Sequence, residues 1–462
     1  MKKTKVVFCS FPDYSSNAKP LYEYMKKEYS DKMELVWAVS SEEMVEKLRK
    51  MKILAYKIGT EEYFDYCKNV DVFFTTHANI IGEKNLNSIY VELWHGIGSK
   101  QSGYLSDKVS NDDKKWYSEI GRKIDYLILP SDFWRVIFST ILNCEYSKIV
   151  PIGYPKLDYF KNPKAKENLA KVLERDVSTY SKIIYYMPTF RKGCARASEE
   201  SKFNVDNAIN IEAYNDDDLD SFLKKNNYLL CIKKHPSEEL ESRFQDRENI
   251  ITIHENDLSD NMITINEILD ASDLMITDYS SLGVEYLFLN KPVLYINTDE
   301  EEYQNNRGII FSEPNFWMPG YKARKLDELI EGIKGSFSNN YKYKEEMEEK
   351  RKLWFGKLND GGCKNICDFL FNKNGEINEE IKKKDKVDGI TLKIEELKEK
   401  NISLSKTIDE KNEVIAQREK RIKELDDFIA QIINSKGWKF LENMRAIKGK
   451  ISCRNIKNKK SE

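Results

Sequence analysis

A chain of 462 residues with 40% hydrophobic and 12% aromatic residues has the composition of a globular protein and the length for two or three domains. Its net charge of −2 hides an asymmetry, because residues 434–462 carry nine Lys and Arg against two Glu. The eight cysteines form no Cys-x-x-Cys pair and no segment approaches the roughly 20 apolar residues of a membrane span, which argues against a zinc site, a disulfide framework and a transmembrane helix. We therefore expect a cytoplasmic chain whose membrane contact, if it has one, is peripheral.

The first part of the chain alternates between predicted strands and helices. Short apolar runs predict strands at 5–9, 33–39, 70–75, 88–93, 126–130 and 148–152, and helical patterns lie near 19–29 and 41–50. Strands that alternate with helices indicate a parallel sheet. We assign residues 1–160 to a first Rossmann-like domain.

The same pattern restarts in the second part. A helix near 164–175 precedes strands at 183–187, 228–232, 250–253, 274–276 and 293–296, residues 190–218 read as a polar loop, and helices continue to about 371. We assign 161–374 to a second Rossmann-like domain. The predicted fold class is α/β, with two doubly wound halves that face a cleft and bind ligands beyond the carboxyl ends of their strands.

A heptad pattern follows and predicts a coiled coil over 386–433. Ten of its thirteen core positions are apolar: Ile394, Asn401, Ile408, Ile415, Ile422 and Ile429 in one row, and Ile390, Leu397, Leu404, Lys411, Arg418, Leu425 and Ile432 in the other. Isoleucine in the first row, leucine in much of the second and a single asparagine favour a parallel dimer. The alternative is one long helix packed on its own body.

The basic end at 434–462 carries Phe440, Met444, Ile447 and Ile451 on one helical face among lysines and arginines. This pattern is typical of an amphipathic helix that docks on an anionic membrane surface. A solvated basic end is the alternative.

The most informative stretch is 273–286, where the apolar run 274–276 is followed by Ser280 and Ser281 and then by helical spacing. A strand, a serine-rich turn and a helix start form an anion site, because free backbone N–H groups point beyond the strand. Two adjacent hydroxyls suit a phosphate, and Glu285, one turn further, could reach a sugar hydroxyl. The alternative is that a serine only caps the helix.

Two of the four histidines follow predicted strands and have glycine or lysine neighbours that suit a ligand site. His95 lies in Trp-His-Gly-Ile-Gly, where glycines allow a close ligand and an imidazole can accept a proton near neutral pH. His235 lies beside Lys233 and Lys234, a setting that suits phosphate. Each histidine taken alone could be structural, and His77 and His254 are assigned a structural role.

Two arginines also lie near strand ends. Arg191 follows the first strand of the second half, and Arg307 follows a polar loop after the strand at 293–296. Arginines in such positions bind phosphate in a bidentate manner, and a surface salt bridge is the alternative. No acidic cluster has evident metal-ligand spacing, so no metal is expected, with Asp278 as the one candidate that leaves the question open.

These motifs together resemble the CDP-glycerol glycerophosphotransferase family, the teichoic acid polymerases and primases. The resemblance covers about residues 5–371 and is carried by Tyr14-Ser15-Ser16-Asn17, Trp94-His95-Gly96, Gly153-Tyr154-Pro155, Pro188-Thr189-Phe190-Arg191, Lys233 to Pro236, Ile276 to Ser281, Arg307-Gly308 and Asp360-Gly361. The family implies a GT-B-like fold and transfer of an alditol phosphate, most simply glycerol phosphate, from a CDP-alditol to a lipid-linked acceptor, with release of CMP and without a cofactor.

The same likeness implies roles for individual residues. His95 is the candidate base, and His235, the second catalytic candidate, contacts the donor's phosphates together with Ser280 and Ser281. From their own positions near strand ends, Arg191 and Arg307 are also expected at the donor phosphates. Asp278 and Glu285 are expected at the ribose or cytidine, and the cleft and acceptor side is expected to include Asn17, Gly96, Lys100 and Tyr154.

The alternatives are a nucleotide-sugar glycosyltransferase on the same scaffold, a CDP-ribitol ribitolphosphotransferase, and a non-catalytic coiled-coil assembly protein. The expected partners are the CDP-alditol, the lipid-linked acceptor, an anionic membrane and a second copy of the chain. No nucleic acid is expected.

Overall fold

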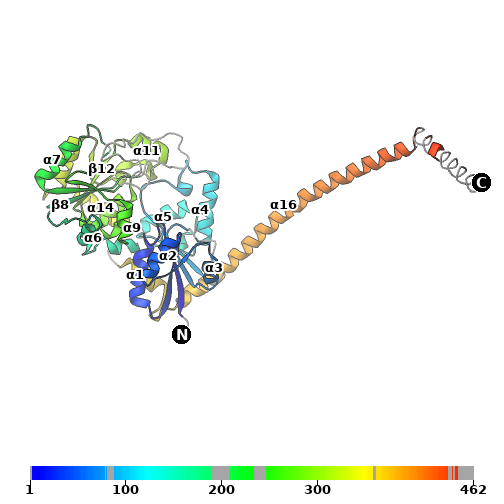
Figure 1. Ribbon diagram of the computed structural model, residues 1–462, viewed down its shortest axis with the longest axis horizontal. Helices are drawn as coiled ribbons and strands as arrows, with labels where there is room; N and C mark the ends of the chain where they lie inside the picture. The colour runs from blue at the N-terminus through cyan, green and yellow to red at the C-terminus, as the bar shows by residue number, and fades with distance from the viewer. Residues whose placement is uncertain are drawn as a thin grey trace, which may run out of the picture. The chain divides into compact units, whose positions relative to one another are not determined.

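The computed structural model describes residues 3–78, 80, 88–189, 209, 211–233, 246–356, 361–434, 437, 440 and 443–445. The chain divides into two compact units, residues 1–387 and 388–462. The first unit contains two parallel sheets with helices packed around them (Figure 1).

The first sheet has seven strands in the order β3-β2-β1-β4-β5-β6-β7. Its strands are β1 (Thr4–Cys9), β2 (Met33–Val39), β3 (Leu54–Lys57), β4 (Val72–Thr75), β5 (Ile89–Glu92), β6 (Tyr126–Ile128) and β7 (Ile149–Val150). Its helices are α1 (Ala18–Tyr29), α2 (Glu42–Lys50), α3 (Glu61–Cys67), α4 (Asn111–Lys123) and α5 (Asp132–Ile141). All strand pairs are parallel, as the alternation of strands and helices predicts.

The second sheet has six parallel strands in the order β10-β9-β8-β11-β12-β13. Its strands are β8 (Lys182–Tyr186), β9 (Tyr228–Ile232), β10 (Ile250–Thr252), β11 (Leu274–Thr277), β12 (Val293–Ile296) and β13 (Tyr321–Ala323). The helices of this half are α6 (Ala165–Val172), α7 (Asp216–Asn226), α9 (Glu255–Asp260), α10 (Ser281–Tyr286), α11 (Glu300–Arg307), α12 (Pro314–Trp317), α13 (Leu326–Ser336) and α14 (Lys344–Phe355).

The predicted fold class is confirmed, and every strand predicted from an apolar run is present. Among the described residues two strands, β3 and β13, were not predicted, and each is one of the two outer strands of its sheet. An outer strand is paired on one side only, so it needs neither the length nor the continuous apolar run of a central strand. A second difference is Arg307, which ends helix α11 instead of following a polar loop.

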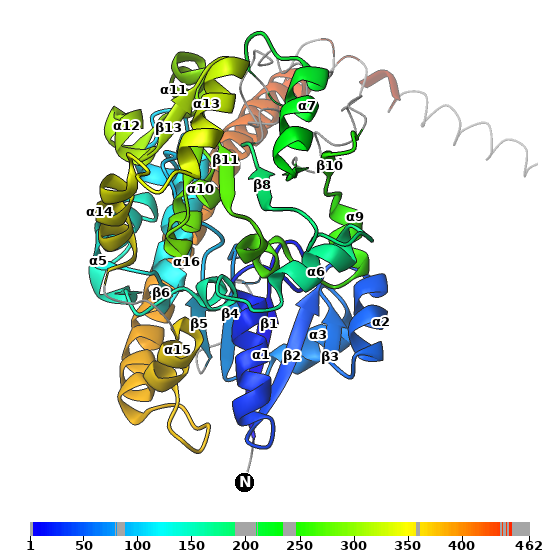
Figure 2. The same ribbon diagram turned by 90° about the vertical axis from the view of Figure 1, so that its left-hand side faces the viewer.

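Helix α15 (Gly362–Leu370) returns to the first sheet (Figure 2). Its side chains Cys363, Ile366, Cys367 and Leu370 belong to the same buried cluster as Val6, Phe8 and Trp37 of β1 and β2. The predicted domain boundaries at 160 and 374 stay predictions. The packing adds that residues after α14 help to build the core of the first half.

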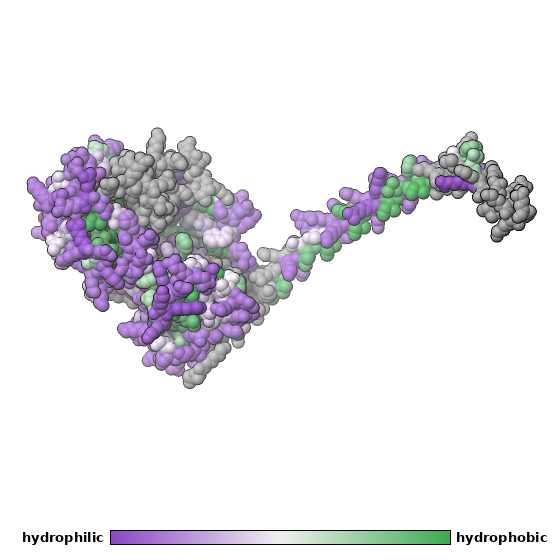
Figure 3. All heavy atoms as spheres, viewed as in Figure 1, coloured by the Kyte–Doolittle hydropathy of each residue, from purple (hydrophilic) through white to green (hydrophobic). Residues whose placement is uncertain are grey.

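The last helix, α16 (Glu379–Asn434), has 56 residues and contains the predicted heptads. Figure 3 shows hydrophobic side chains along its surface. Its pairing with a second helix stays a prediction. Within the described part of the chain, no helix has the length and hydropathy that crossing a membrane requires.

Candidate active site

The turn after β5 and the start of α10 meet where the two sheets face each other. A Cβ added to Gly98 would lie 3.0 Å from the Cα of Ser281, and one added to Gly96 would lie 3.1 Å from the Ser281 Oγ. Such distances leave no room for a side chain at Gly98 without a shift of the Ser281 backbone, which explains the glycine. The structure therefore brings the Trp-His-Gly turn against the serine-rich stretch 273–286 that was most informative in the sequence.

His95 directly precedes Gly96 in this turn. Its Nδ1 lies 3.2 Å from the carbonyl oxygen of Thr76, and a carbonyl can only accept, so this contact selects the tautomer with the proton on Nδ1. The Nε2 lone pair is then available to accept a proton. His95 is exposed at one side, and the protein around it removes much of the water that would stabilise a charged ring. This desolvation lowers the pKa of His95 to about 4, and the positive charges of Lys156 and Lys100 act in the same direction.

His77 packs directly against His95. The two imidazoles are stacked with centroids 4.1 Å apart and planes inclined by 10°. Burial and the neighbouring His95 lower the pKa of His77 to about 3, so both rings are neutral at neutral pH. Sequence reasoning assigned His77 a purely structural role, because its neighbours in the chain carry no glycine-rich or basic pattern.

Glu92 connects the turn that carries His77 with the turn that carries His95. Its fully buried carboxylate accepts hydrogen bonds from the Thr75 hydroxyl at 2.6 Å, the Ala78 N–H at 2.8 Å and the Trp94 N–H at 2.9 Å. Burial raises the pKa of Glu92 to about 7, against the opposing effect of these donors. The signal that could have found it is a carboxylate in the otherwise apolar strand β5.

Glu285 and Lys156 form a buried ion pair between the two halves. The Lys156 Nζ lies 2.6 Å from the Glu285 Oε1, and the two side chains are 5% and 1% exposed. The same Nζ donates to the His95 carbonyl at 2.9 Å, and the Ile97 N–H donates to Glu285 at 3.2 Å. Burial raises the pKa of Glu285, and Lys156 opposes that rise. The pair thus holds the backbone on both sides of Gly96.

Asn17 fixes the same turn from the other side. Its Nδ2 donates to the carbonyls of Leu93 and Trp94, and its Oδ1 accepts from the Lys156 N–H. Trp94 adopts φ +52°, a left-handed conformation that is uncommon for a bulky residue. Asn17 is fully buried, so it supports the turn, and its predicted contact with the acceptor stays a prediction.

Tyr154 and its neighbours also have a supporting position. Tyr154 is 1% exposed, and Gly153 approaches α15 so closely that its added Cβ would lie 2.7 Å from the Gly362 Cα. Asp158 accepts from the N–H groups of Gly361, Gly362 and Cys363 and so caps α15. The Gly-Tyr-Pro motif and Gly361 of the Asp-Gly motif therefore meet in space. An acceptor contact by Tyr154 stays a prediction.

Asp278 and the serines occupy the end of β11. The Asp278 carboxylate is 4% exposed and accepts from the N–H and hydroxyl of Thr189, which joins the ends of β11 and β8. Ser280 caps α10, since its Oγ accepts from the Leu282 N–H at 3.3 Å. Ser280 and Ser281 are half-buried. Donor contacts by Asp278, Glu285 and both serines stay predictions.

A short ladder joins the two halves, with Lys100 at its centre and Arg307 just before its second strand. Lys100 bridges Ile309 in antiparallel fashion, the Gln101 N–H donates to the Gly308 carbonyl, and the Ile310 N–H donates to the Ser99 carbonyl. The buried Arg307 Nε has no hydrogen-bond partner among the described residues.

Two predicted site residues, Arg191 and His235, lie outside the described residues. Where the structure describes side chains, no group of three or more His, Cys, Asp or Glu could hold a metal ion. The prediction that neither a metal nor a cofactor is required remains untested.

Known proteins match this chain over most of its length. The family model for CDP-Glycerol:Poly(glycerophosphate) glycerophosphotransferase matches residues 1–372. A teichoic acid poly(glycerol phosphate) polymerase of Bacillus spizizenii is 26% identical over 366 residues, covering 74% of this chain and 85% of the relative. A teichoic acid glycerol-phosphate primase of Bacillus subtilis is 25% identical over 374 residues, covering 78% and 90%.

A solved structure confirms the fold. The wall teichoic acid polymerase TagF is similar with a TM-score of 0.62 at 21% identity, over 83% of this chain and 90% of that one. The match of the family model to residues 1–372 shows that the chain belongs to the CDP-glycerol glycerophosphotransferase family.

Proposed function

We propose that this enzyme transfers an alditol phosphate from a CDP-alditol to a hydroxyl of a lipid-linked acceptor, in the synthesis of teichoic acid or a related surface polymer. Glycerol phosphate is the first candidate for the transferred group, and ribitol phosphate is the second. The observation that carries the proposal is the neutral His95, whose Nδ1 contact with the Thr76 carbonyl leaves the lone pair on Nε2. The histidine lies in the turn whose Gly96 and Gly98 approach Ser281, and the charges of Lys156 and Lys100 act on it. The names of the relatives, polymerases and primases of poly(glycerol phosphate), support the substrate class.

The proposed reaction is a single in-line displacement at phosphorus. His95 Nε2 takes the proton of the acceptor hydroxyl while that oxygen forms a bond to the phosphorus that carries the alditol. The bond from this phosphorus to the bridging oxygen breaks, and CMP leaves with the electron pair. Catalysis of phosphoryl transfer consists largely of positioning and charge stabilisation, which the cations and the amides at Ser280 and Ser281 would supply.

The remaining site residues take the following proposed roles. Arg191, His235 and Arg307 contact the donor phosphates, Asp278 and Glu285 face the ribose or cytidine, and Gly96 and Lys100 face the acceptor. Neither a metal nor a cofactor is required in this proposal.

The test is release of CMP by purified protein supplied with CDP-glycerol, CDP-ribitol or sugar nucleotides together with a short acceptor. We expect CMP release with a CDP-alditol, and release slower by roughly 10²–10⁴-fold from the His95→Ala variant. Turnover of sugar nucleotides alone would overturn the proposal in favour of a glycosyltransferase.

We further propose that the second unit makes the enzyme a parallel dimer. Heptad residues of α16 with described side chains are exposed in the single chain, for instance Ile408 at 57%, Ile415 at 52% and Ile422 at 58%. Burial against a second α16 removes this apolar surface from water. The basic residues 434–462 then dock on the anionic inner face of the membrane, which keeps the enzyme beside a lipid-linked acceptor.

A further inference from the structure

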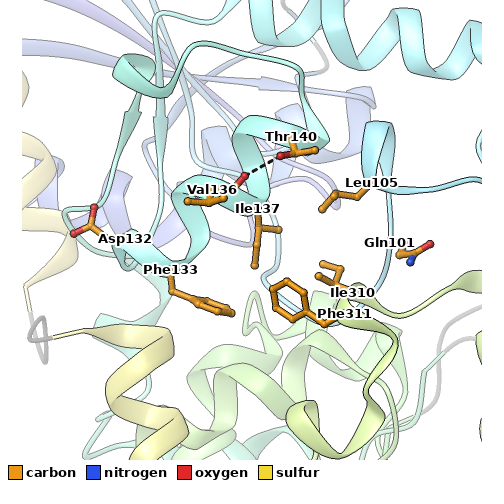
Figure 4. A pocket seen from close by; sticks show the side chains of 9 residues that line it. All are labelled: Gln101, Leu105, Asp132, Phe133, Val136, Ile137, Thr140, Ile310 and Phe311. Atoms are coloured by element: carbon orange, nitrogen blue, oxygen red, sulfur yellow. Dashed lines mark hydrogen bonds between the residues drawn. The ribbon is translucent and has the colours of Figure 1, made fainter.

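An apolar pocket opens beside the ladder that joins the two halves (Figure 4). Its volume is about 320 Å³, within the range of small-molecule sites. The residues that line it come from α5, from the short helix Gly103–Leu105, from the turn Ile310–Ser312 and from Gln101 of the ladder.

The polar groups of this pocket are engaged elsewhere. The Thr140 hydroxyl donates to the Val136 carbonyl at 3.1 Å, and the Gln101 Nε2 donates to the Ile309 carbonyl at 3.1 Å. Asp132 lies 3.2 Å from Arg135 in an ion pair. Aliphatic and aromatic side chains therefore surround the space, as Figure 4 shows for Phe133, Ile137 and Phe311. Such a lining favours a ligand without hydrogen-bonding groups.

Phe311 has an unfavourable backbone conformation and an exposed apolar side chain. It adopts φ +67°, which is strained for a residue with a bulky side chain, and 60% of it is exposed. Val136 of α5, which also lines the pocket, is 61% exposed. Strain and exposed apolar surface at the mouth of a pocket are features of ligand sites.

Positive charge lies next to the pocket along the chain. Lys100 pairs with Ile309 in the ladder and directly precedes Gln101, and Arg307 comes three residues before Ile310, so both cations are near neighbours of lining residues along the chain. An apolar pocket beside cations matches an amphiphile with a hydrocarbon chain attached to a phosphate.

We propose that this pocket binds the first part of the hydrocarbon chain of the lipid-linked acceptor, with the lipid phosphate near Lys100. The proposal rests on the proposed function for the identity of the acceptor and adds where its lipid is held. In this proposal the enzyme recognises the lipid of the acceptor as well as the hydroxyl group that it extends.

A binding experiment tests the pocket without any need for turnover. Alkyl phosphates from hexyl to decyl are titrated below their micelle concentrations, and tryptophan fluorescence is followed, since Trp317 stacks on Phe311 with centroids 6.0 Å apart. We expect the affinity to rise with chain length, by up to about fourfold for each methylene buried, whereas inorganic phosphate alone binds weakly. Affinity independent of chain length would overturn the proposal.

Two variants place a charge in the pocket, Val136→Asp and Phe311→Asp. The matched control is Phe64→Asp, which places the same charge on an exposed phenylalanine of α3, 47% exposed and remote from the pocket lining. We expect the first two to weaken decyl phosphate at least tenfold and to lower the ratio of kcat/KM for a lipid-linked acceptor to that for a short water-soluble acceptor by a similar factor. The control should change neither quantity.

The failures are distinguishable. If the unaltered protein releases no CMP from a CDP-alditol with either acceptor, the proposed function fails. If it releases CMP but folded Val136→Asp and Phe311→Asp keep the original acceptor ratio and bind decyl phosphate normally, the lipid pocket fails. A change of oligomeric state in these variants, seen by sedimentation with an unchanged ratio, would assign the pocket to a protein interface and likewise overturn the proposal.

Discussion

His77 and His95 stack as two neutral imidazoles 4.1 Å apart, although 17 positions of the chain separate them. His95 is held twice, by this stack and by the contact of its Nδ1 with the Thr76 carbonyl. A base held in this way loses little freedom when the substrates bind.

The first prediction concerns the pH dependence of the base. The pKa of His95 is lowered to about 4, so the ring is neutral above that pH and the acid limb of kcat/KM should lie well below 6.5. A bound anionic donor favours the imidazolium, so the acid limb of kcat should lie at higher pH than that of kcat/KM.

His95→Ala should lower turnover by roughly 10²–10⁴-fold and keep its melting temperature. Near-normal CMP release from folded His95→Ala would remove His95 from the mechanism.

The second prediction separates stacking from acid–base chemistry at His77. His77→Ala removes the ring that supports His95 and should lower kcat by roughly ten- to hundredfold, since small misplacements of a base are costly. His77→Phe keeps a flat ring and should recover most of the loss. Steady-state kinetics of both variants decide between the roles: equal loss in the two would mean that the imidazole itself takes part.

The third prediction concerns the buried pair Lys156–Glu285. Lys156→Met leaves a buried carboxylate without its partner and should cost about 3–5 kcal/mol in the free energy of unfolding. Without Lys156 the pKa of Glu285 rises further, so this loss should grow as the pH is raised. The control is Lys68→Met, which breaks an exposed pair with Asp65 and should cost less than about 1 kcal/mol. Urea denaturation at two pH values measures both, and equal small losses would mean that the pair does not hold the halves.

The fourth prediction tests the contact of Gly98 with Ser281. In Gly98→Ala the new Cβ forces the start of α10 to move, so the donor KM should rise and stability should fall by roughly 1–3 kcal/mol. Gly335→Ala in α13 adds a Cβ with no atom within 4 Å and should leave both quantities unchanged or slightly improve stability. If the two variants behave alike, the close approach has no functional weight.

The fifth prediction concerns α16. Ile408→Asp places a charge in the heptad seam and should convert the dimer to a monomer and weaken binding to anionic vesicles, because each monomer then presents one basic end. Ile402→Asp is the matched control, an exposed isoleucine of the same helix outside the seam, and should stay dimeric. Sedimentation and vesicle flotation of the full chain provide the measurements. A monomeric unaltered protein that ignores anionic vesicles would refute both proposals for the tail.

The sequence predicts the central strands well because a buried parallel strand is apolar along most of its length, as β9 and β12 are. It identifies the turn at His95 and the serines at 280 and 281 because glycines and hydroxyls at strand ends form a local pattern. The stack of His77 on His95 was not predicted, since it depends on how two turns pack. Glu285 was expected to face a sugar, and its pairing with Lys156 depends on burial, which one sequence does not display.

The return of α15 to the first sheet has a consequence for how the chain acquires its shape during synthesis. The first sheet leaves the ribosome early, but Cys363, Ile366 and Leu370 of its core are made some two hundred residues after its last strand. Until then the β1–β2 surface lacks part of its cover, so the first half cannot reach full stability ahead of the second. The two halves are therefore expected to mature together, as one cooperative unit.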